Sequence, residues 1–351
     1  MISEFPDPAT HPSLSQEEMA HALDLLLRPE IAEEGKGRFL TELQRRGETA
    51  AELAGFAEIL LEAGVKPEIY RDHQAPLVEL CGTGGDKAGL LNISTAAMFV
   101  VAGAGARVVK HGNRAVSSQC GSADVLEALG VALHLRPEAV GAVLEQAGSV
   151  FLLASDFHPA VAAVGPLRRS LAAQGQRTIF NLLGPLLNPA RPDFQLTGVY
   201  APELLDLYAA ALGLLGRRTA WAVHGMGKSG EGGFDELSIV GDSRVAAFEN
   251  GKIRRLIIDP KELGFSENYA TSSLRGGNAP ENAARIVAIL NGSETGAARD
   301  MIVLNAAASL HLAGMAATLP EGISLATESL DSGKASRALK LLRQASTEAA
   351  R

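Results

Sequence analysis

The sequence predicts an α/β protein in which a small helical N-terminal domain precedes a larger α/β domain with a mainly parallel central sheet. Two patterns support this fold class. Capped helical segments follow one another through residues 1–75, and from residue 77 onward short apolar runs alternate with helical segments. With 351 residues and 46% hydrophobic content, the chain is long enough to bury a large core. We place the small domain at residues 1–75, completed by helices near residues 165–190, and the α/β domain at residues 76–351.

Three helices are expected in the small domain. Ser15 and Glu18 form a capping box for a helix that runs to Leu27. A second helix covers Ile31–Arg45, and a third opens at the capping pair of Thr49 and Glu52. The spare apolar faces of these helices could pair with a second subunit or pack on the rest of the chain.

In the α/β domain, short apolar runs bounded by turn residues predict strands. An Asn-Gly turn predicts an antiparallel hairpin over Phe248–Ile253. Helices are expected from Asn278 to near Asn291, over about Ala297–Ala313 and over Ser336–Glu348. The expected strands are Leu77–Cys81, Ala106–Val109, Val150–Leu153, Thr219–Val223 and Leu237–Val240.

The first candidate site is a glycine-rich turn that follows the strand Leu77–Cys81. The glycines at 82, 84 and 85 permit positive φ angles and a close approach of a ligand to the backbone. Asn92, Ser94 and Thr95 then stand where a helix N-terminus is expected. A glycine turn that leads into a helix N-terminus offers N–H donors and the positive end of a dipole, which suits a phosphate. An ordinary tight connection would have the same glycines.

The second candidate site is a polar loop after the strand that ends at Val109. Lys110, His111, Asn113 and Arg114 stand together around Gly112, and Ser117, Ser118 and Ser122 precede a helix over Asp124–Leu129. Lys and Arg donate charge-assisted hydrogen bonds to phosphate oxygens. A solvated basic loop is the alternative, but the formal net charge of −8 makes this local cluster distinctive. We therefore favour an anion site.

Composition excludes several classes of protein. The acidic balance argues against a general nucleic-acid surface, and no apolar run approaches the roughly 20 residues that a membrane span needs. Only two cysteines occur, so no disulfide framework is implied. The N-terminus has no apolar signal region, and we expect a cytoplasmic protein.

Asp235 and Glu236 form the third candidate site. Adjacent carboxylates after a glycine-rich loop are often a solvated turn, but beside a diphosphate site such oxygen ligands hold Mg²⁺. Ser94 could supply a further ligand. The nearby run Gly225–Ser229 does not have the spacing of a P-loop, and His224 has no neighbouring His or Cys with which to bind zinc.

Four blocks of sequence together resemble the anthranilate phosphoribosyltransferases. The blocks are GTGGD with NIST, KHGNRAVSS with GSADVLEALG, HPA followed by RR and RTIFNLLGPLLNPA, and GFDELS. The similarity extends from about Ser13 to about Gly314. It implies transfer of the phosphoribosyl group from 5-phosphoribosyl 1-diphosphate (PRPP) to the amine of anthranilate, with Mg²⁺, in tryptophan biosynthesis. It also implies a homodimer that forms through the N-terminal helices, with neither nucleic acid nor membrane as a partner.

The resemblance assigns a role to each matching residue. Acceptor contacts fall on Gly82, Asn113, His158 and Arg168, and metal contacts on Ser94, Asp235 and Glu236. No residue is assigned as a general acid or base. The donor contacts fall on Gly82, Gly85, Asp86, Asn92, Ile93, Ser94, Thr95, Lys110, His111, Gly112, Asn113, Arg114, Ala115, Val116, Ser117, Ser118 and Ser122.

The chain departs from the family pattern in a few places. Lys87 replaces a usual Gly, and Leu90 stands where Thr or Ser usually contacts the donor. Ala172–Gln174 lengthens the segment between Arg168 and Arg177, and the loop Gly225–Gly233 is longer than usual. Three rival functions are therefore kept: a phosphoribosyltransferase for another aromatic acceptor, a pyrimidine nucleoside phosphorylase of related fold, and a non-catalytic regulatory or nucleic-acid-binding relative.

Overall fold

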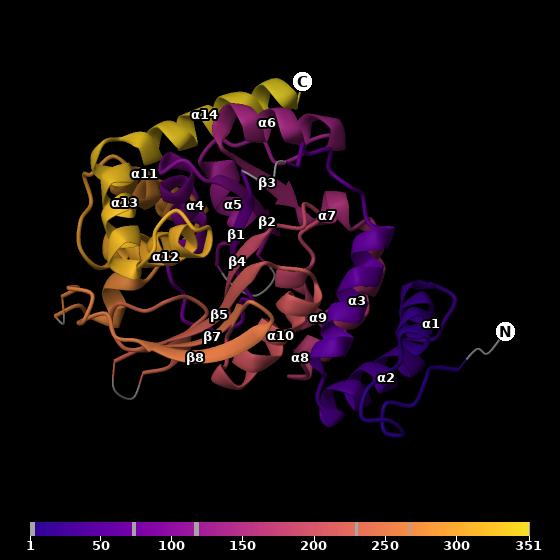
Figure 1. Ribbon diagram of the computed structural model, residues 1–351. Helices are drawn as coiled ribbons and strands as arrows, with labels where there is room; N and C mark the ends of the chain where they lie inside the picture. The colour runs from indigo at the N-terminus through magenta and orange to yellow at the C-terminus, as the bar shows by residue number, and fades with distance from the viewer. Residues whose placement is uncertain (1–3, 72–74, 116–118, 229–230, 267, 351) are drawn as a thin grey trace.

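The computed structural model describes residues 4–71, 75–115, 119–228, 231–266 and 268–350. Figure 1 shows a central sheet with helices on both faces, and α1, α2 and α3 grouped at one side. The strands are β1 Leu77–Gly82, β2 Arg107–Gly112, β3 Ser149–Leu153, β4 Phe194–Gly198, β5 Thr219–Met226, β6 Gly233–Phe234, β7 Ser243–Glu249 and β8 Lys252–Ile258. The N-terminal helices are α1 Gln16–Leu27, α2 Glu33–Arg46 and α3 Ala50–Ala63.

The remaining helices alternate with the strands and then close the chain. They are α4 Ile93–Gly103, α5 Ser122–Ala128, α6 Val140–Ala147, α7 Ala154–Phe157, α8 Gly165–Ala173, α9 Phe180–Leu183, α10 Leu205–Leu214, α11 Ala279–Leu290, α12 Ala297–Leu312, α13 Leu319–Asp331 and α14 Lys334–Ala349. Short 3₁₀ turns lie at Pro137–Ala139, Pro159–Val164, Gly184–Leu186, Pro202–Leu204 and Thr271–Leu274. Among the described helices, none is long and apolar enough to cross a membrane.

The sheet is mainly parallel, as the sequence predicts. Its order is β3-β2-β1-β4-β5-β7-β8, with β6 paired to β5. The strands from β3 to β5 pair in parallel, and β6, β7 and β8 add antiparallel pairs at one edge. The chain runs outward from β1 to β3 and then returns to β4 on the other side of β1. The strand order therefore reverses between β1 and β4, where ligands bind at the carboxyl ends of open α/β sheets.

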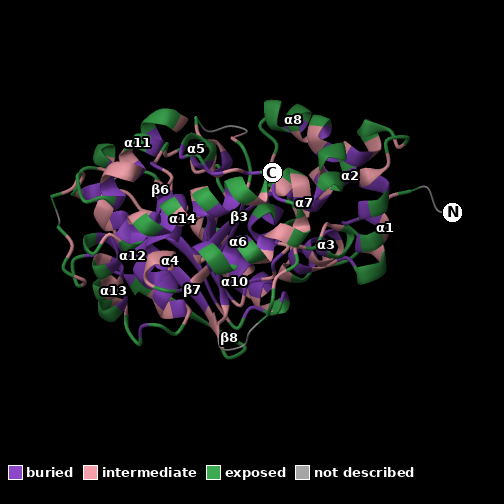
Figure 2. Cartoon of the chain, turned by 90° about the horizontal axis from the view of Figure 1, so that it is seen from above, coloured by how far each residue is buried: buried purple, intermediate pink, exposed green. Residues whose placement is uncertain are grey.

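Two apolar clusters cover the two faces of the sheet. One cluster packs α4, α6 and the C-terminal helices α11–α14 on the sheet, and the other joins α1–α3 with α8, α9 and α10. Figure 2 shows the resulting pattern, with buried strands inside a shell of helices whose outer faces are exposed. The capping boxes predicted for α1 and α3 are present, and α11 has a further one formed by Asn278 and Glu281.

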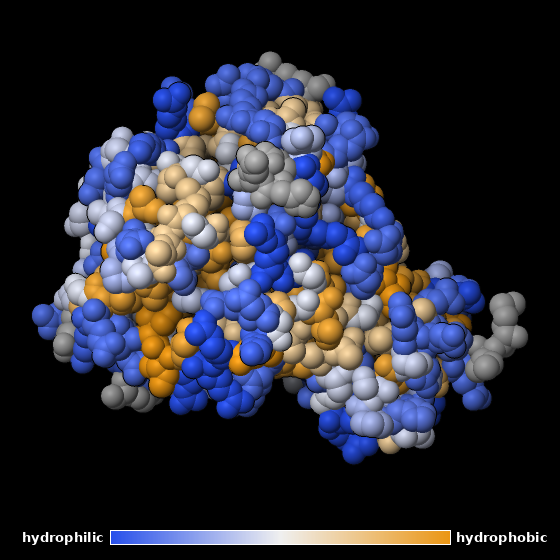
Figure 3. All heavy atoms as spheres, viewed as in Figure 1, coloured by the Kyte–Doolittle hydropathy of each residue, from blue (hydrophilic) through white to orange (hydrophobic). Residues whose placement is uncertain are grey.

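The predicted hairpin is the β7–β8 pair. Asn250 and Gly251 have φ angles of 51° and 74°, which a two-residue turn between twisted antiparallel strands requires. β8 lies at the edge of the sheet and carries the exposed residues Lys252, Arg254 and Arg255. Figure 3 shows hydrophilic residues gathered over this strand. Such charges discourage pairing with another sheet edge.

The predicted strand Leu237–Val240 is wrong. The backbone N–H of Leu237 donates to Asn305 Oδ1 at 3.0 Å, and Asn305 Nδ2 donates to the Leu237 carbonyl at 3.0 Å. The N–H of Ser238 donates to Ser243 Oγ. Side chains therefore make the hydrogen bonds to these backbone groups that a neighbouring strand would otherwise make. Leu237 and Ile239 remain buried in the core. The elements that the sequence did not predict are β4, β6, α6, α7, α10 and α13.

The ladder between β1 and β2 is short. It covers only the pairs Leu77–Arg107 and Val78–Val108, whereas the ladder between β1 and β4 continues to Gly82–Gly198. Beyond those two pairs, side chains bridge the two strands. Glu79 Oε1 accepts the N–H of His111 at 3.1 Å, and Asn188 Nδ2 donates to the Val109 carbonyl at 2.9 Å. β1 and β2 are thus joined through side chains at their carboxyl ends, next to the reversal in strand order.

Glu79 is fully buried in this bridge. Burial raises the pKa of Glu79 to about 7, although the charge of Arg217 and hydrogen bonds from Asn188 and His111 oppose the shift. Arg217 is buried as well, and burial lowers its pKa to about 10. Among the described residues, Glu79 Oε2 and Arg217 Nη2 have no hydrogen-bond partner. Glu79 therefore binds its proton more tightly in the folded chain than in the unfolded one.

We predict that Glu79→Gln flattens the dependence of stability on pH. Because the folded pKa of about 7 exceeds the ordinary glutamate pKa of 4.5, Glu79 adds stability below pH 4.5, and this is lost as pH rises to 7. The loss amounts to about 3 kcal/mol at most. Urea unfolding of both proteins at pH 5, 6, 7 and 8 measures it. The exposed Glu262→Gln is the control, and parallel profiles for wild type and Glu79→Gln would contradict the assignment.

Candidate functional site

The glycine-rich turn and the carboxylate pair lie against each other. The N–H of Gly84 donates to Asp235 Oδ2 at 2.7 Å. A Cβ atom at Gly82 would lie 2.3 Å from Asp235 Oδ2, and one at Gly198 would lie 1.5 Å from the Asp235 carbonyl oxygen. Any other residue at Gly82 or Gly198 would displace Asp235. Gly84 and Gly85 have φ angles of 66° and 79°, so the turn itself uses the conformation that glycine permits.

The N-terminus of α4 meets the second carboxylate. The N–H of Ser94 donates to Glu236 Oε1 at 3.0 Å. Asn92 occupies the N-cap position but does not cap the helix with its side chain. Instead, Asn92 Nδ2 donates to the Cys120 carbonyl, and Asn92 Oδ1 accepts Asn282 Nδ2 at 2.9 Å. Ile93 and Thr95 are buried. The carboxylate of Glu236 therefore already occupies one N–H donor of the predicted anion site, that of Ser94.

Lys110 joins the basic loop to the glycine-rich turn. Its side chain is buried, and its ammonium donates to the Leu80 carbonyl at 2.6 Å and to Ser94 Oγ at 3.1 Å. Burial lowers the pKa of Lys110, while the charges of Glu236, Glu79 and Asp235 oppose the shift. One cation thus sits where β1, β2 and α4 meet. The two segments that the sequence nominated as an anion site lie together in the fold.

The rest of the basic loop is held by α5. A Cβ atom at Gly112 would lie 2.2 Å from Ser122 Oγ, and this hydroxyl donates to the Asn113 carbonyl at 3.4 Å. Ala115 N–H donates to Asp124 Oδ2. Val116, Ser117 and Ser118 lie outside the described residues.

Arg114, which the sequence predicts as a phosphate contact, is already paired with a carboxylate. Its two terminal nitrogens each donate to Glu127 at 2.8 Å, which raises the pKa of Arg114. The carboxylate thus already engages the guanidinium of this predicted donor contact.

Of the predicted acceptor residues, His158 lies at the end of α7 and Arg168 lies on α8. His158 is buried, and its Nε2 lies 2.6 Å from the Leu187 carbonyl, so Nε2 carries the proton. Its ring meets that of His111 edge-on at 5.5 Å. Burial lowers the pKa of His111 to about 3 and also lowers that of His158, so both rings are neutral at pH 7.

Arg168 stands apart from the donor cluster in its described contacts. Its Nη2 donates to the Phe180 carbonyl at 3.3 Å, and its guanidinium lies 5.7 Å from the centroid of the Phe180 ring. Burial lowers the pKa of Arg168. Among the described residues no carboxylate pairs with Arg168. A half-buried guanidinium without a carboxylate suits a carboxylate-bearing ligand.

The carboxylates of the site suit a divalent cation. Burial, with the nearby charges of Asp86 and Glu236, raises the pKa of Asp235 well above its usual range, and burial raises that of Glu236 to about 7. A cation between Asp235 and Glu236 would relieve this repulsion. Among the described residues, no group of three or more His, Cys, Asp or Glu could hold a metal alone. Mg²⁺ fits such a partial site because it completes its shell with water and phosphate oxygens.

The departures from the family pattern have local structural outcomes. Lys87 has a φ of 60°, the left-handed region that glycine enters without strain. Leu90 forms an isolated antiparallel bridge with Arg275. The segment Ala172–Gln174 forms the C-terminal end of α8. The chain that follows Gly225 includes β6, which pairs with β5.

Sequence reasoning missed several residues that support the site. Glu79 and Asn188 bridge β1 and β2, and Arg177 donates to the Gly85 carbonyl at 3.1 Å. The signal for Glu79 was present, because an acidic residue inside an apolar strand must be buried with partners. Asn188 and Arg177 gave no such signal, since their partners lie far away in the sequence.

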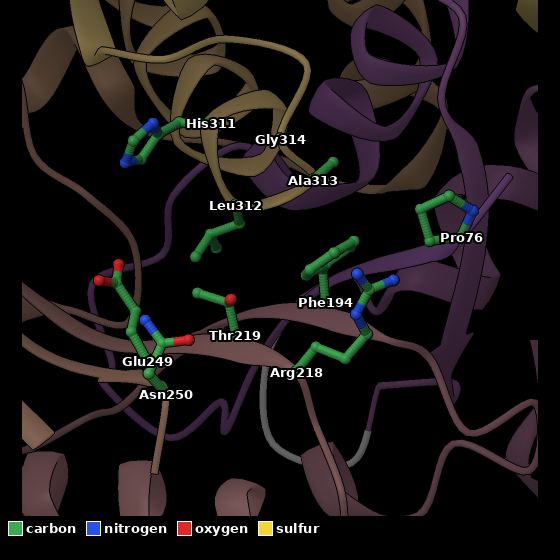
Figure 4. Close-up of a pocket in the computed structure, with 10 residues that line it drawn as sticks. All are labelled: Pro76, Phe194, Arg218, Thr219, Glu249, Asn250, His311, Leu312, Ala313 and Gly314. Carbon is green, nitrogen blue, oxygen red and sulfur yellow. The ribbon is translucent and has the colours of Figure 1, made fainter. Parts of the chain in front are cut away.

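A cavity of about 470 Å³ lies at the opposite end of the parallel strands. Figure 4 shows Arg218 and Phe194 side by side on its floor, with His311 and Leu312 from the end of α12 above them. Pro76, Phe194 and Thr219 mark the starts of β1, β4 and β5, so this cavity faces away from Gly82 and Gly198 at their ends. It is separate from the cluster around Lys110.

Two family models and many relatives match the chain. The "Glycosyl transferase family, a/b domain" covers residues 74–336, and the "Glycosyl transferase family, helical bundle domain" covers residues 9–64. The anthranilate phosphoribosyltransferases of Moorella thermoacetica and Roseiflexus castenholzii are 45% and 46% identical to this chain. Each match covers 94% of this chain and 93% of the relative.

Solved structures agree. The crystal structure of anthranilate phosphoribosyltransferase from Thermus thermophilus has a TM-score of 0.87 and 39% identity, covering 97% of this chain and 100% of that one. The Saccharomyces cerevisiae enzyme in complex with PRPP and Mg has a TM-score of 0.82 and 26% identity, covering 95% and 92%. The yeast enzyme in complex with 4-fluoroanthranilate has a TM-score of 0.83 and 26% identity, and the match covers 95% of this chain and 94% of that one. The fold, the cluster at the strand ends and these likenesses agree: the chain belongs to the anthranilate phosphoribosyltransferase family of glycosyl transferases.

Proposed function

We propose that this protein transfers the phosphoribosyl group of PRPP to the amine of anthranilate, giving N-(5-phosphoribosyl)anthranilate and diphosphate in tryptophan biosynthesis. The observation that supports it best is the cluster at the carboxyl ends of β1, β2 and β4. There, Lys110 contacts both Leu80 and Ser94, and Asp235 lies against the turn at Gly82 and Gly84. N–H donors, a cation and carboxylates meet in one place, as a sugar diphosphate with Mg²⁺ requires.

The turn at Gly82–Asp86, the start of α4 and the loop from Lys110 hold the donor in this proposal. The exposed backbone of Gly84 and Gly85 lets phosphate oxygens approach the chain. Lys110 supplies positive charge inside the protein, where electrostatic interactions are stronger than in water. In the free chain, Asp235 and Glu236 accept the N–H groups of Gly84 and Ser94. These carboxylates keep the donor groups ordered before substrate arrives.

Asp235 and Glu236, with Ser94, would hold Mg²⁺. When bound, the ion supplies charge that stabilises the departing diphosphate. Asp235 also holds the glycine turn through Gly84, and Glu236 holds the start of α4 through Ser94. The yeast relative solved in complex with PRPP and Mg motivates this assignment.

Arg168, Asn113, Gly82 and His158 are proposed to hold the acceptor. Arg168 can form charge-assisted hydrogen bonds to a carboxylate. A neutral His158 forms part of the wall without adding charge. An aryl amine is neutral at pH 7 and needs no strong base, so catalysis consists mainly of positioning and stabilisation of the leaving group. The proton acceptor is left unassigned.

We also propose how the chain is organised in the cell. The small domain spans residues 1–75, completed by helices near residues 165–190, and its spare apolar faces form a homodimer in the cytoplasm. Closure of this domain on the α/β domain would exclude water from the reacting donor. A second aromatic amine as acceptor is the main alternative, because Ala172–Gln174 lengthens the chain beside Arg168.

The first experiment follows anthranilate consumption by fluorescence with PRPP and Mg²⁺. We expect turnover by the wild type and a fall of roughly 10²-fold or more in kcat for Asp235→Asn. Asn keeps an acceptor for Gly84 but loses the charge, so the turn stays in place while the metal contact weakens. Reaction with other aromatic amines but not with anthranilate would contradict the acceptor assignment. The proposed phosphoribosyl transfer from PRPP would still stand.

Arg168→Ala tests the acceptor site. We expect KM for anthranilate to rise about 10- to 100-fold, because a hydrogen bond to a charged group is lost, and KM for PRPP to stay near the wild-type value. Arg169→Ala is the matched control, since Arg169 is exposed on the same helix. Equal effects of the two substitutions would rule out a specific role for Arg168.

A further inference from the structure

The segment after α8 reaches from the helical bundle to the glycine-rich turn. Thr41 Oγ1, on α2, donates to Gln176 Oε1 at 3.2 Å. The next residue, Arg177, donates through Nη2 to the Gly85 carbonyl at 3.1 Å. Two adjacent residues thus connect α2 to the proposed donor turn.

Tyr200 completes this contact from the end of β4. Its ring lies 3.7 Å from the Arg177 guanidinium carbon, and its backbone N–H donates to Thr83 Oγ1 at 3.0 Å. The N–H of Thr83 donates in turn to the Gly198 carbonyl. The turn is therefore tied at Thr83 from the sheet and at Gly85 from Arg177.

The turn needs such support. Gly84 and Gly85 are exposed, have positive φ angles and have no side chains with which to pack. Ordering glycine costs more backbone entropy than ordering any other residue. Among the described residues, no carboxylate pairs with Arg177, so its guanidinium is held by a carbonyl and a ring alone. Arg177 therefore holds the turn without adding a further carboxylate to Asp86 and Asp235, which already lie there.

We propose that Arg177, stacked on Tyr200, is a positioning residue that holds the Thr83–Asp86 turn ready for the diphosphate of the donor. The inference rests on the proposed function for the identity of the ligand. It assigns a role to the segment that Ala172–Gln174 lengthens: the turn is held from the acceptor side of the site. Arg177 acts through Gly85 and does not need to touch the reacting atoms.

The test compares wild type, Arg177→Ala, Arg177→Lys and Tyr200→Leu, with Arg169→Ala as control. We expect Arg177→Ala to raise KM for PRPP about tenfold and to change kcat by less than about twofold. Lys can still reach the Gly85 carbonyl but cannot stack flat on the ring, so its effect should be intermediate. Tyr200→Leu should shift KM for PRPP in the same direction, because it removes the ring and leaves the backbone bond to Thr83.

Hydrogen exchange of residues 82–89 in the ligand-free proteins provides a readout besides activity. We expect faster exchange in Arg177→Ala and Tyr200→Leu than in wild type or Arg169→Ala. Unchanged exchange and unchanged KM for PRPP would overturn the inference. So would a fall in kcat alone, which would place Arg177 on the reacting atoms. If the wild type transfers nothing to anthranilate, the proposed function fails. Hydrogen exchange of residues 82–89 and calorimetric binding of PRPP would still test the positioning role of Arg177.

Discussion

The buried ammonium of Lys110 is the interaction on which the site depends. It donates to the Leu80 carbonyl and to Ser94 Oγ, so a single side chain joins β1, β2 and α4. A buried charge is costly unless other groups compensate it. Glu236, Glu79 and Asp235 provide that compensation through their charges. The carboxylates and the lysine therefore depend on each other. β1 and β2 separate around them, next to the point between β1 and β4 where the strand order reverses.

Close packing explains why glycine stands at both strand ends. The chain at Asp235 passes so near Gly198 and Gly82 that no Cβ atom fits at either position. This approach brings carboxylates from a loop after β6 against a turn after β1, although more than 100 residues separate them in the sequence. The same carboxylates accept the N–H groups of Gly84 and Ser94. A cation and a diphosphate would meet groups that are already ordered, which lowers the cost of binding.

Local chemistry made much of the fold predictable. Capping pairs such as Thr49 with Glu52, and the Asn250-Gly251 turn, act within a few residues, so sequence alone identified their elements. Leu237–Val240 has the composition of a strand, but Asn305 from a distant helix takes its backbone bonds. The convergence of the turn and the Lys110 loop was predicted, whereas the pairing of Arg114 with Glu127 and the contact of Arg177 with Gly85 were not. Both depend on side-chain directions that spacing does not specify.

A crystal structure of the protein with PRPP and Mg²⁺ tests the central claim most directly. We expect the diphosphate between the turn at Gly82–Asp86 and the start of α4, within hydrogen-bond reach of Lys110 or Ser94, with the metal on Asp235 or Glu236. A donor bound elsewhere, for example in the cavity beside Arg218 at the opposite end of the parallel strands, would contradict the account.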